Sequence, residues 1–232
     1  MLTVDQLELR QEDFRLSATF SLAAGGITAL IGPSGAGKSS LLNVIGGFYT
    51  PASGRVLWDG TDITDLRPGA RPCTSLFQDN NLFPHLTIAA NVGLALSPDL
   101  RLSAAQEAQV TASLAQVGLA DMGTRKPATL SGGQQARAAL ARALLQDRPL
   151  VLLDEPFSAL GPALKVEMLD LVQDTFAGAG RTVLMVTHDP QDALRIADEI
   201  IFVADGSVTG PHPARSFMEN PPPALRAYLG AS

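Results

Sequence analysis

The stretch ITALIGPSGAGKSS, residues 27–40, decides the fold of this 232-residue chain. Its first part, ITALIG (27–32), is continuously apolar and ends in glycine, which predicts a buried strand that leads into a loop. GPSGAGKS (32–39) fits the spacing G-x-x-x-x-G-K-S/T, and the following SLLNVIGGF has helical spacing. Glycines let successive backbone N–H groups point at phosphate oxygens, and the N-terminus of the helix adds partial positive charge. The sequence therefore predicts a site for a nucleoside triphosphate.

Within this loop, Lys38 is predicted to reach the β- and γ-phosphates and Ser39 to donate its hydroxyl oxygen to Mg²⁺. The alternative is a glycine-rich turn that binds nothing, and the strand and helix on either side disfavour it. The residues that we expect to contact the nucleotide are Gly32, Pro33, Ser34, Gly35, Ala36, Gly37, Lys38, Ser39 and Ser40.

The second motif, LVLLDEP (150–156), is acidic: it is an apolar strand that ends in two acids. Ligands of open α/β sheets bind at the carboxyl ends of the strands. Asp154 is therefore predicted to hold Mg²⁺, directly or through water, and Glu155 to polarise the attacking water. Taken alone, an apolar strand that ends in Asp-Glu more often has only a structural role. The phosphate loop upstream in the same chain makes the functional interpretation strong.

The chain around these motifs alternates between strands and helices. Residues 2–9 and 14–22 alternate apolar and polar, which predicts an antiparallel pair. RPLVLLD (148–154) and RTVLMVTHD (181–189) predict parallel strands covered by helices, and EIIFVADGSV (199–208) predicts a closing hairpin.

The segment between these regions is rich in Ala, Leu and Gln with helical period. The predicted fold is α/β: a P-loop NTPase core with a mixed, mainly parallel sheet and flanking helices, an antiparallel β subdomain and an inserted α-helical subdomain. We predict a single domain over 1–232, with the helical subdomain at 79–147. The tail, with its prolines at 221–223, is expected to be a short surface appendage.

Composition narrows the functional classes. The chain is 46% hydrophobic and 17% charged with a net charge of −6, and no basic block stands out, so no nucleic-acid partner is expected. No apolar run approaches the about 20 residues that span a bilayer. A soluble cytoplasmic protein is predicted, which a partner can hold at a membrane. The single cysteine, Cys73, is expected to be a small structural residue in a turn.

Together, these motifs resemble the nucleotide-binding subunit of an ABC transporter over nearly the whole chain. LSGGQ (130–134), Gln78 in SLFQDNNLF and His188 in MVTHD complete the family's set in its usual order. The resemblance implies that Gln78 contacts Mg²⁺ and the water and relays the nucleotide state to a partner. It implies that His188 contacts the γ-phosphate and that Glu155 is the catalytic carboxylate. The alternatives are a solvated loop residue at Gln78 and a polar strand end at His188.

LSGGQ is a second glycine-rich start of a helix, in a chain that already has one phosphate loop. A second anion-binding helix start is best explained if it covers the γ-phosphate of ATP on an opposite subunit. The resemblance thus implies a homodimer that closes on two ATP molecules. The residues that would contact this second nucleotide are Leu130, Ser131, Gly132, Gly133 and Gln134.

Two positions depart from the family's pattern. The aromatic residue that stacks on adenine normally lies in the early strands, and Phe14 is the candidate, with a core position as the alternative. In SALGPAL (158–164), Gly161 stands where the family usually has an aspartate that communicates between the two sites. This departure puts the strength of that coupling in doubt, but not ATP binding.

Within the family, the chain is similar to the ATPase subunits of bacterial importers. This implies two transmembrane permease subunits, a periplasmic or extracellular solute-binding protein, and a peripheral location on the cytoplasmic face of the inner membrane. The permease is expected to dock at 79–100, where Leu82 and Phe83 are either contacts or core residues.

The segments 77–96 and 154–172 look most like the ATPase subunits of thiamine importers. An importer of another small solute, such as an inorganic anion, a polyamine or a metal, is the alternative, and a non-transport ABC ATPase is a more distant one.

Overall fold

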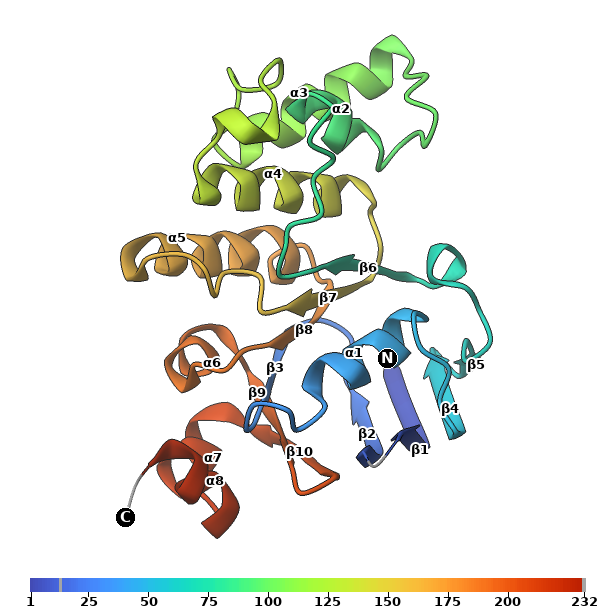
Figure 1. The fold of residues 1–232 in the computed structure, drawn as a ribbon, viewed down its shortest axis with the longest axis vertical. Helices are drawn as coiled ribbons and strands as arrows, with labels where there is room; N and C mark the ends of the chain where they lie inside the picture. The colour runs from blue at the N-terminus through green and yellow to red at the C-terminus, as the bar shows by residue number, and fades with distance from the viewer. Residues whose placement is uncertain (13, 231–232) are drawn as a thin grey trace.

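The computed structural model describes residues 1–12 and 14–230. In this part of the chain, one sheet of ten strands runs through the molecule in the order β5-β4-β1-β2-β10-β9-β3-β8-β7-β6 (Figure 1). The strands are β1 (Leu2–Gln11), β2 (Phe14–Leu22), β3 (Ile27–Ile31), β4 (Ser53–Trp58), β5 (Thr61–Asp62), β6 (Cys73–Leu76), β7 (Leu150–Asp154), β8 (Thr182–Val186), β9 (Glu199–Ala204) and β10 (Ser207–Pro213). The helices are α1 (Lys38–Gly46), α2 (Ile88–Gly93), α3 (Ala104–Gln116), α4 (Gly132–Leu145), α5 (Pro162–Val172), α6 (Pro190–Ile196), α7 (Ala214–Glu219) and α8 (Pro223–Leu229).

Strands β9, β3, β8, β7 and β6 pair in parallel and form the part of the sheet that carries the motifs. All residues of β3 and β8 are buried, as expected for strands that are covered on both faces. The register pairs Leu30 and Asp154 with the same residue, Val186. The ends of β3, β7 and β8 therefore meet at one edge of the sheet, and the phosphate loop, the acidic pair and the His188 segment all begin there.

The two faces of the parallel strands contact different helices. Val151 and Leu153 of β7 belong to a core shared with α2, α3, α4 and α5. Leu150 and Leu152 of the same strand belong to a core shared with α1 and strands β1 and β2. The alternation of side chains along a strand thus places α1, which follows the phosphate loop, on the face opposite to α4 and α5.

The predicted antiparallel pair at the N-terminus is confirmed, because β1 pairs with β2 from Leu2↔Leu22 to Gln11↔Phe14. It is continuous with the parallel strands through one parallel contact between β10 and β2, Ser207↔Ser17. Cys73 differs from its prediction: it is buried at the start of β6 and does not lie in a turn. A four-residue strand is too short to show the alternation or the continuous apolar run that identified other strands.

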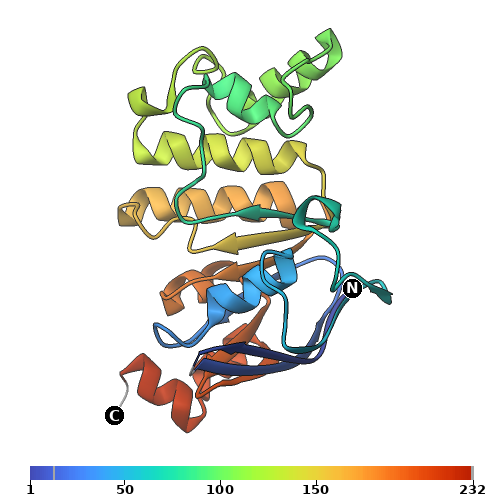
Figure 2. The ribbon, with the colours of Figure 1, turned by 45° about the vertical axis from the view of Figure 1, so that its right-hand side comes forward.

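Helices α2, α3 and α4 gather at one end of the molecule, between β6 and β7 in the chain (Figures 1 and 2). The described chain forms no strand between these two, as the sequence indicated. The division into one domain with an inserted helical subdomain stays a prediction. None of the helices among the described residues is both long and apolar enough to cross a membrane.

The tail is not the surface appendage that its prolines suggested. It forms α7 and α8, and Pro223 occupies the first turn of α8, where a missing N–H costs nothing. Leu225 is fully buried in a cluster with residues of β3, β9 and α6. The last described helix therefore packs against the sheet that carries the motifs.

Candidate functional site

The phosphate loop lies between β3 and α1 and depends on two glycines. A Cβ at Gly32 would stand 2.0 Å from the carbonyl oxygen of Val203, and one at Gly37 would stand 2.3 Å from Cζ of Phe14. Gly37 is also left-handed, with φ 96°, and caps α1 without any side-chain hydrogen bond. No acidic residue occupies the first turn of α1, so the N–H groups there are free of competing carboxylates. The loop offers the uncapped positive end of a helix to an anion.

Lys38 is folded back over this loop. Its Nζ donates hydrogen bonds to the carbonyl oxygens of Gly32 at 2.8 Å and Pro33 at 2.9 Å, and only 6% of the residue is exposed. Burial lowers the pKa of Lys38, while the charges of Glu155 and Asp154 oppose this effect. The ammonium group thus lies in the curve of the loop beside two carboxylates.

Ser39 and Asp154 bring two oxygen atoms together at the mouth of the loop. The hydroxyl of Ser39 donates to Oδ1 of Asp154 at 2.8 Å, although the residues are 115 positions apart. Burial raises the pKa of Asp154, and its hydrogen bond with Ser39 acts in the opposite direction. The pair that the sequence assigned to a magnesium ion is therefore in contact.

Glu155 and His188 form the second pair, with 2.9 Å between Oε2 and Nδ1. The Glu155 side chain is 23% exposed and that of His188 is 60% exposed, so the pair opens to solvent. Glu155 has φ 44°, a left-handed conformation that costs a non-glycine residue about 1 kcal/mol or more. Its amide donates to the carbonyl of Val186 at 3.1 Å, which holds this turn against the end of β8.

A cavity of about 440 Å³ opens directly over the loop and contains Lys38, Ser39 and Glu155 in its lining. Phe14 also lines it and packs against both Gly37 and the core around β1 and β2. Its ring is therefore at the edge of this cavity and at the edge of the core, which fits both interpretations of this residue. The remaining lining residues are Gln11, Ser34, Gly35, Gly37 and Ser40.

Gln78 lies in the exposed turn after β6 and does not line this cavity. Arg142 of α4 fixes the following residues, because its guanidinium donates to the carbonyl oxygens of Asn81 at 2.7 Å and Asn80 at 2.8 Å. Both asparagines have positive φ. The turn that carries Gln78 is thus held from the helix that begins at LSGGQ.

LSGGQ forms the start of α4, as predicted. Ser131 caps the helix, and its hydroxyl accepts from the amide of Gln134 at 3.3 Å while the Gln134 side chain accepts from the amide of Ser131 at 3.0 Å. Ser131 and Gly132 are exposed, whereas Gly133 is buried. None of Leu130–Gln134 lines the cavity at the phosphate loop. The segment is an exposed helix start that does not line the phosphate-loop cavity of its own chain.

Sequence patterns did not identify three residues whose side chains bind the segments that carry Gln78 and His188. Besides Arg142, these are Lys165 of α5, which pairs with Asp189 and with Asp192 at 2.9 Å, and Tyr228 of α8, whose hydroxyl donates to the carbonyl of His188 at 2.8 Å. Each contact joins segments at least 24 residues apart. No local pattern signals such contacts.

The fold and the site together define an ATP-binding cassette, and comparison with known proteins agrees. Residues 16–158 match the family model described as ABC transporter. The chain belongs to the ABC transporter family and has its ATPase fold.

Individual relatives are similar over the full length. The chain is 58% identical over 230 residues to the thiamine import ATP-binding protein ThiQ of Cereibacter sphaeroides, covering 99% of this chain and 100% of that protein. It is 54% identical to ThiQ of a Ruegeria species, over 100% of each. Among solved structures, the dimeric post-hydrolysis state of the ATP-binding cassette MJ0796 with ADP and Pi is similar with a TM-score of 0.80 at 30% identity, over 93% of this chain and 99% of that one.

Proposed function

We propose that the chain is the ATP-hydrolysing subunit of a thiamine importer, and that it works as a homodimer bound to two membrane permease subunits. One observation supports the hydrolytic part above all: a phosphate loop, an oxygen pair and a carboxylate–imidazole pair meet at one edge of the sheet. The cargo is suggested by the full-length relatives, which are thiamine import proteins.

The site fits a magnesium ion. Mg²⁺ prefers hard oxygen ligands and is usually held by one or two protein groups together with substrate phosphates. Ser39 and Asp154 supply such oxygens, and no group of three or more His, Cys, Asp or Glu in the described residues offers an all-protein site. The ion would neutralise charge on the β- and γ-phosphates. Gln78, now exposed, would join it only if its turn moves inward.

Hydrolysis requires a positioned water and little covalent chemistry from the protein. His188 contacts one carboxylate oxygen of Glu155, which leaves the other oxygen to accept a hydrogen bond from the attacking water. Lys38 is held among backbone carbonyls, and it would exchange these for phosphate oxygens. Glu155 is thus the residue that orients the water, and His188 keeps the carboxylate in place.

LSGGQ completes the site from the opposite subunit in this proposal. Its exposed helix start does not line the phosphate cavity of its own chain, and the solved MJ0796 cassettes with the same fold are dimers. A mixing experiment tests this arrangement. Lys38→Ala and Ser131→Arg chains should each be inactive, but their mixed dimer contains one intact composite site.

Random mixing of the two variants should therefore restore roughly one quarter of the wild-type rate, because half of the dimers carry one working site of two. Recovery cannot occur if LSGGQ acts on the ATP of its own chain. A mixture as inactive as its components would contradict the assignment.

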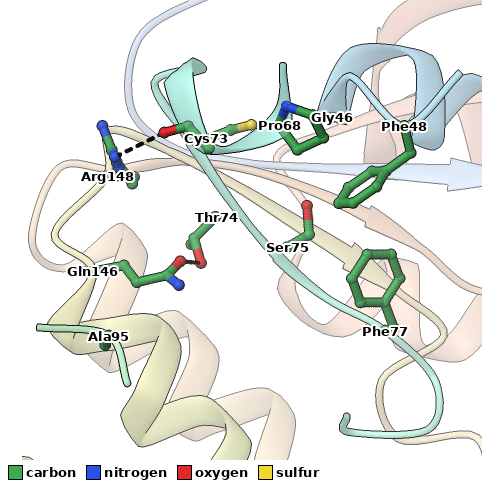
Figure 3. A pocket seen from close by; sticks show the side chains of 11 residues that line it. Gly46, Phe48, Pro68, Cys73, Thr74, Ser75, Phe77, Ala95, Gln146 and Arg148 are labelled. Atoms are coloured by element: carbon green, nitrogen blue, oxygen red, sulfur yellow. Dashed lines mark hydrogen bonds between the residues drawn. The ribbon is translucent and has the colours of Figure 1, made fainter. Parts of the chain in front are cut away.

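A groove between the parallel sheet and the helical end of the molecule is the proposed docking place of the permease. It has a volume of about 310 Å³ and is lined by residues of α1 and β6 and of the segments that follow α1, β5, β6, α2 and α4 (Figure 3). Phe48 and Phe77 meet edge to face across it, 5.2 Å between centroids, and Phe77 precedes Gln78. Of the two residues expected to dock, Phe83 does not line the groove but is 47% exposed in the segment that follows Phe77, whereas Leu82 packs against the core.

Co-purification tests this surface. Phe48→Ser and Phe83→Ser should lower the amount of permease that a tagged chain recovers from detergent extracts. Leu194→Ser is the matched control, since Leu194 is 41% exposed on α6 and belongs neither to the groove nor to the expected docking segment 79–100. Equal recovery with all three variants would contradict the docking site.

Cargo is tested by reconstituting the chain with its permease and solute-binding protein in liposomes. ATP-dependent accumulation of labelled thiamine is expected, with phosphate, spermidine and a divalent metal as competitors. Accumulation of one of these in place of thiamine would leave the ATPase assignment intact and contradict the cargo.

A further inference from the structure

The C-terminal helix α8 reaches the catalytic edge of the sheet through Tyr228. Its hydroxyl donates to the carbonyl oxygen of His188 at 2.8 Å, across 40 residues of sequence. Its ring packs against Phe202 of β9 with 6.0 Å between the centroids. Leu225, one turn earlier, is fully buried and anchors the helix. The hydroxyl is therefore held at a fixed position from two sides.

The same hydroxyl lies close to the start of the phosphate loop and to the catalytic carboxylate. Burial raises the pKa of Tyr228, and the negative charges of Asp189 and Glu155 raise it further, while a hydrogen bond with the Gly32 backbone opposes them. The phenol thus keeps its proton throughout the neutral pH range and remains a hydrogen-bond donor to His188. The hydrogen bond of Tyr228 therefore joins α8 to the His188 segment.

His188 needs such support because its segment is short. It lies between the end of β8 at Val186 and the start of α6 at Pro190, and its side chain is largely exposed. Asp189 is held by Lys165 on the α5 side. Tyr228 holds the carbonyl of His188 itself on the α8 side. The backbone of His188 is thus fixed between α5 and α8, and its ring contacts Glu155.

We propose that Tyr228 is a positioning residue for ATP hydrolysis, which fixes the backbone of His188 and through it the contact between His188 and Glu155. This rests on the proposed ATPase function and adds to it a role for the C-terminal helix. Displacement of α8 would slow hydrolysis without removing any group that contacts the nucleotide. The binding of ATP itself, which uses the phosphate loop, would change little.

The test compares Tyr228→Phe with Tyr49→Phe. The chain has two tyrosines, so Tyr49→Phe removes the same hydroxyl from an exposed residue elsewhere. For Tyr228→Phe, we expect kcat to fall about three- to ten-fold, which corresponds to the loss of one net hydrogen bond in the transition state. The Kd for ATP should stay within about two-fold of wild type.

Two further readouts distinguish the proposed positioning role of Tyr228 from a purely structural role. The rate is expressed per ATP-binding chain, which removes any unfolded fraction. NMR of the three labelled histidine rings should show a changed Nδ1 signal for His188, while His85 and His212 remain as in the wild type.

A fall in kcat with unchanged Kd and a changed His188 signal supports the proposal. A wild-type rate per ATP-binding chain in Tyr228→Phe, or an equal fall in Tyr49→Phe, overturns it. If the wild-type chain hydrolyses no ATP in the same assay, the proposed function fails as well, so the two failures are distinguishable.

Discussion

Adjacent glycines of LSGGQ should respond in opposite ways to the same substitution. Gly132 and Gly133 both lie in the first turn of α4. A Cβ at Gly132 would meet only Cδ2 of Leu160 at 3.7 Å, an ordinary contact. A Cβ at Gly133 would stand 2.2 Å from Cδ2 of Leu164, with the two neighbouring carbons of that side chain at 3.1 and 3.2 Å. Alanine thus has room at the first position and clashes with α5 at the second.

These distances set the expected change in the free energy of unfolding for each alanine variant. Gly132→Ala should stabilise the isolated chain by about 0.5–1 kcal/mol, because alanine favours the helix and loses less backbone entropy on folding. Gly133→Ala gains the same amount, but overpacking against Leu164 costs about 1–3 kcal/mol. We expect a net loss of about 1–2 kcal/mol. For a chain of this size, the Tm should rise by about 1–4 °C for Gly132→Ala and fall by about 2–8 °C for Gly133→Ala.

Thermal unfolding of the nucleotide-free chain measures both changes. Leu164→Ala removes the side chain that causes the clash, so in this background Gly133→Ala should become as favourable as Gly132→Ala. Equal Tm values for the two alanine variants in the wild-type background would refute the reasoning. The result decides how inactive variants are interpreted, because a large residue at Gly133 disturbs its own subunit, whereas Ser131 is exposed.

Three further predictions concern residues around the site. Gly161→Asp should raise the Tm by about 1–4 °C, since nothing lies within 4 Å of the added Cβ and α5 lacks a side-chain cap; a changed Hill coefficient for hydrolysis should accompany it, and a lower Tm would count against this. Arg142→Gln should increase amide hydrogen exchange at 77–83, because the guanidinium holds the carbonyls of Asn80 and Asn81; unchanged exchange would show that the turn is held otherwise. Burial raises the pKa of Cys73 to about 11, so iodoacetamide at pH 8 should alkylate the folded chain at least about 100-fold more slowly than the unfolded one, and similar rates would contradict this.

Local patterns predicted the parts of the fold that short segments determine. The phosphate loop followed from fixed glycine spacing between a strand and a helix, and the antiparallel pair from strict alternation. The placement of Asp154 and Glu155 at the ligand-binding edge followed from a general property of parallel strands, whereas His188 was assigned from the family resemblance. The structure brings Ser39 to Asp154 and His188 to Glu155. Their chemical roles stay predictions.

Long-range contacts could not be predicted in this way. The tail is rich in proline, but one buried leucine and one tyrosine fix it on the sheet. Gly133 was interpreted as part of a phosphate-binding start of a helix, and only the packing of α4 on α5 shows that its missing Cβ makes room for Leu164. Both contacts depend on how distant elements meet, and sequence periodicity carries no information on that.

The most direct test of the central claim is the rate of ATP hydrolysis by Glu155→Gln. Glutamine keeps the size of the side chain but removes the negative charge that orients the water. The variant should bind ATP as the wild type does, hydrolyse it at least about 100-fold more slowly, and accumulate as an ATP-bound dimer in size-exclusion chromatography. Hydrolysis at the wild-type rate would contradict the assignment of Glu155 as the catalytic carboxylate.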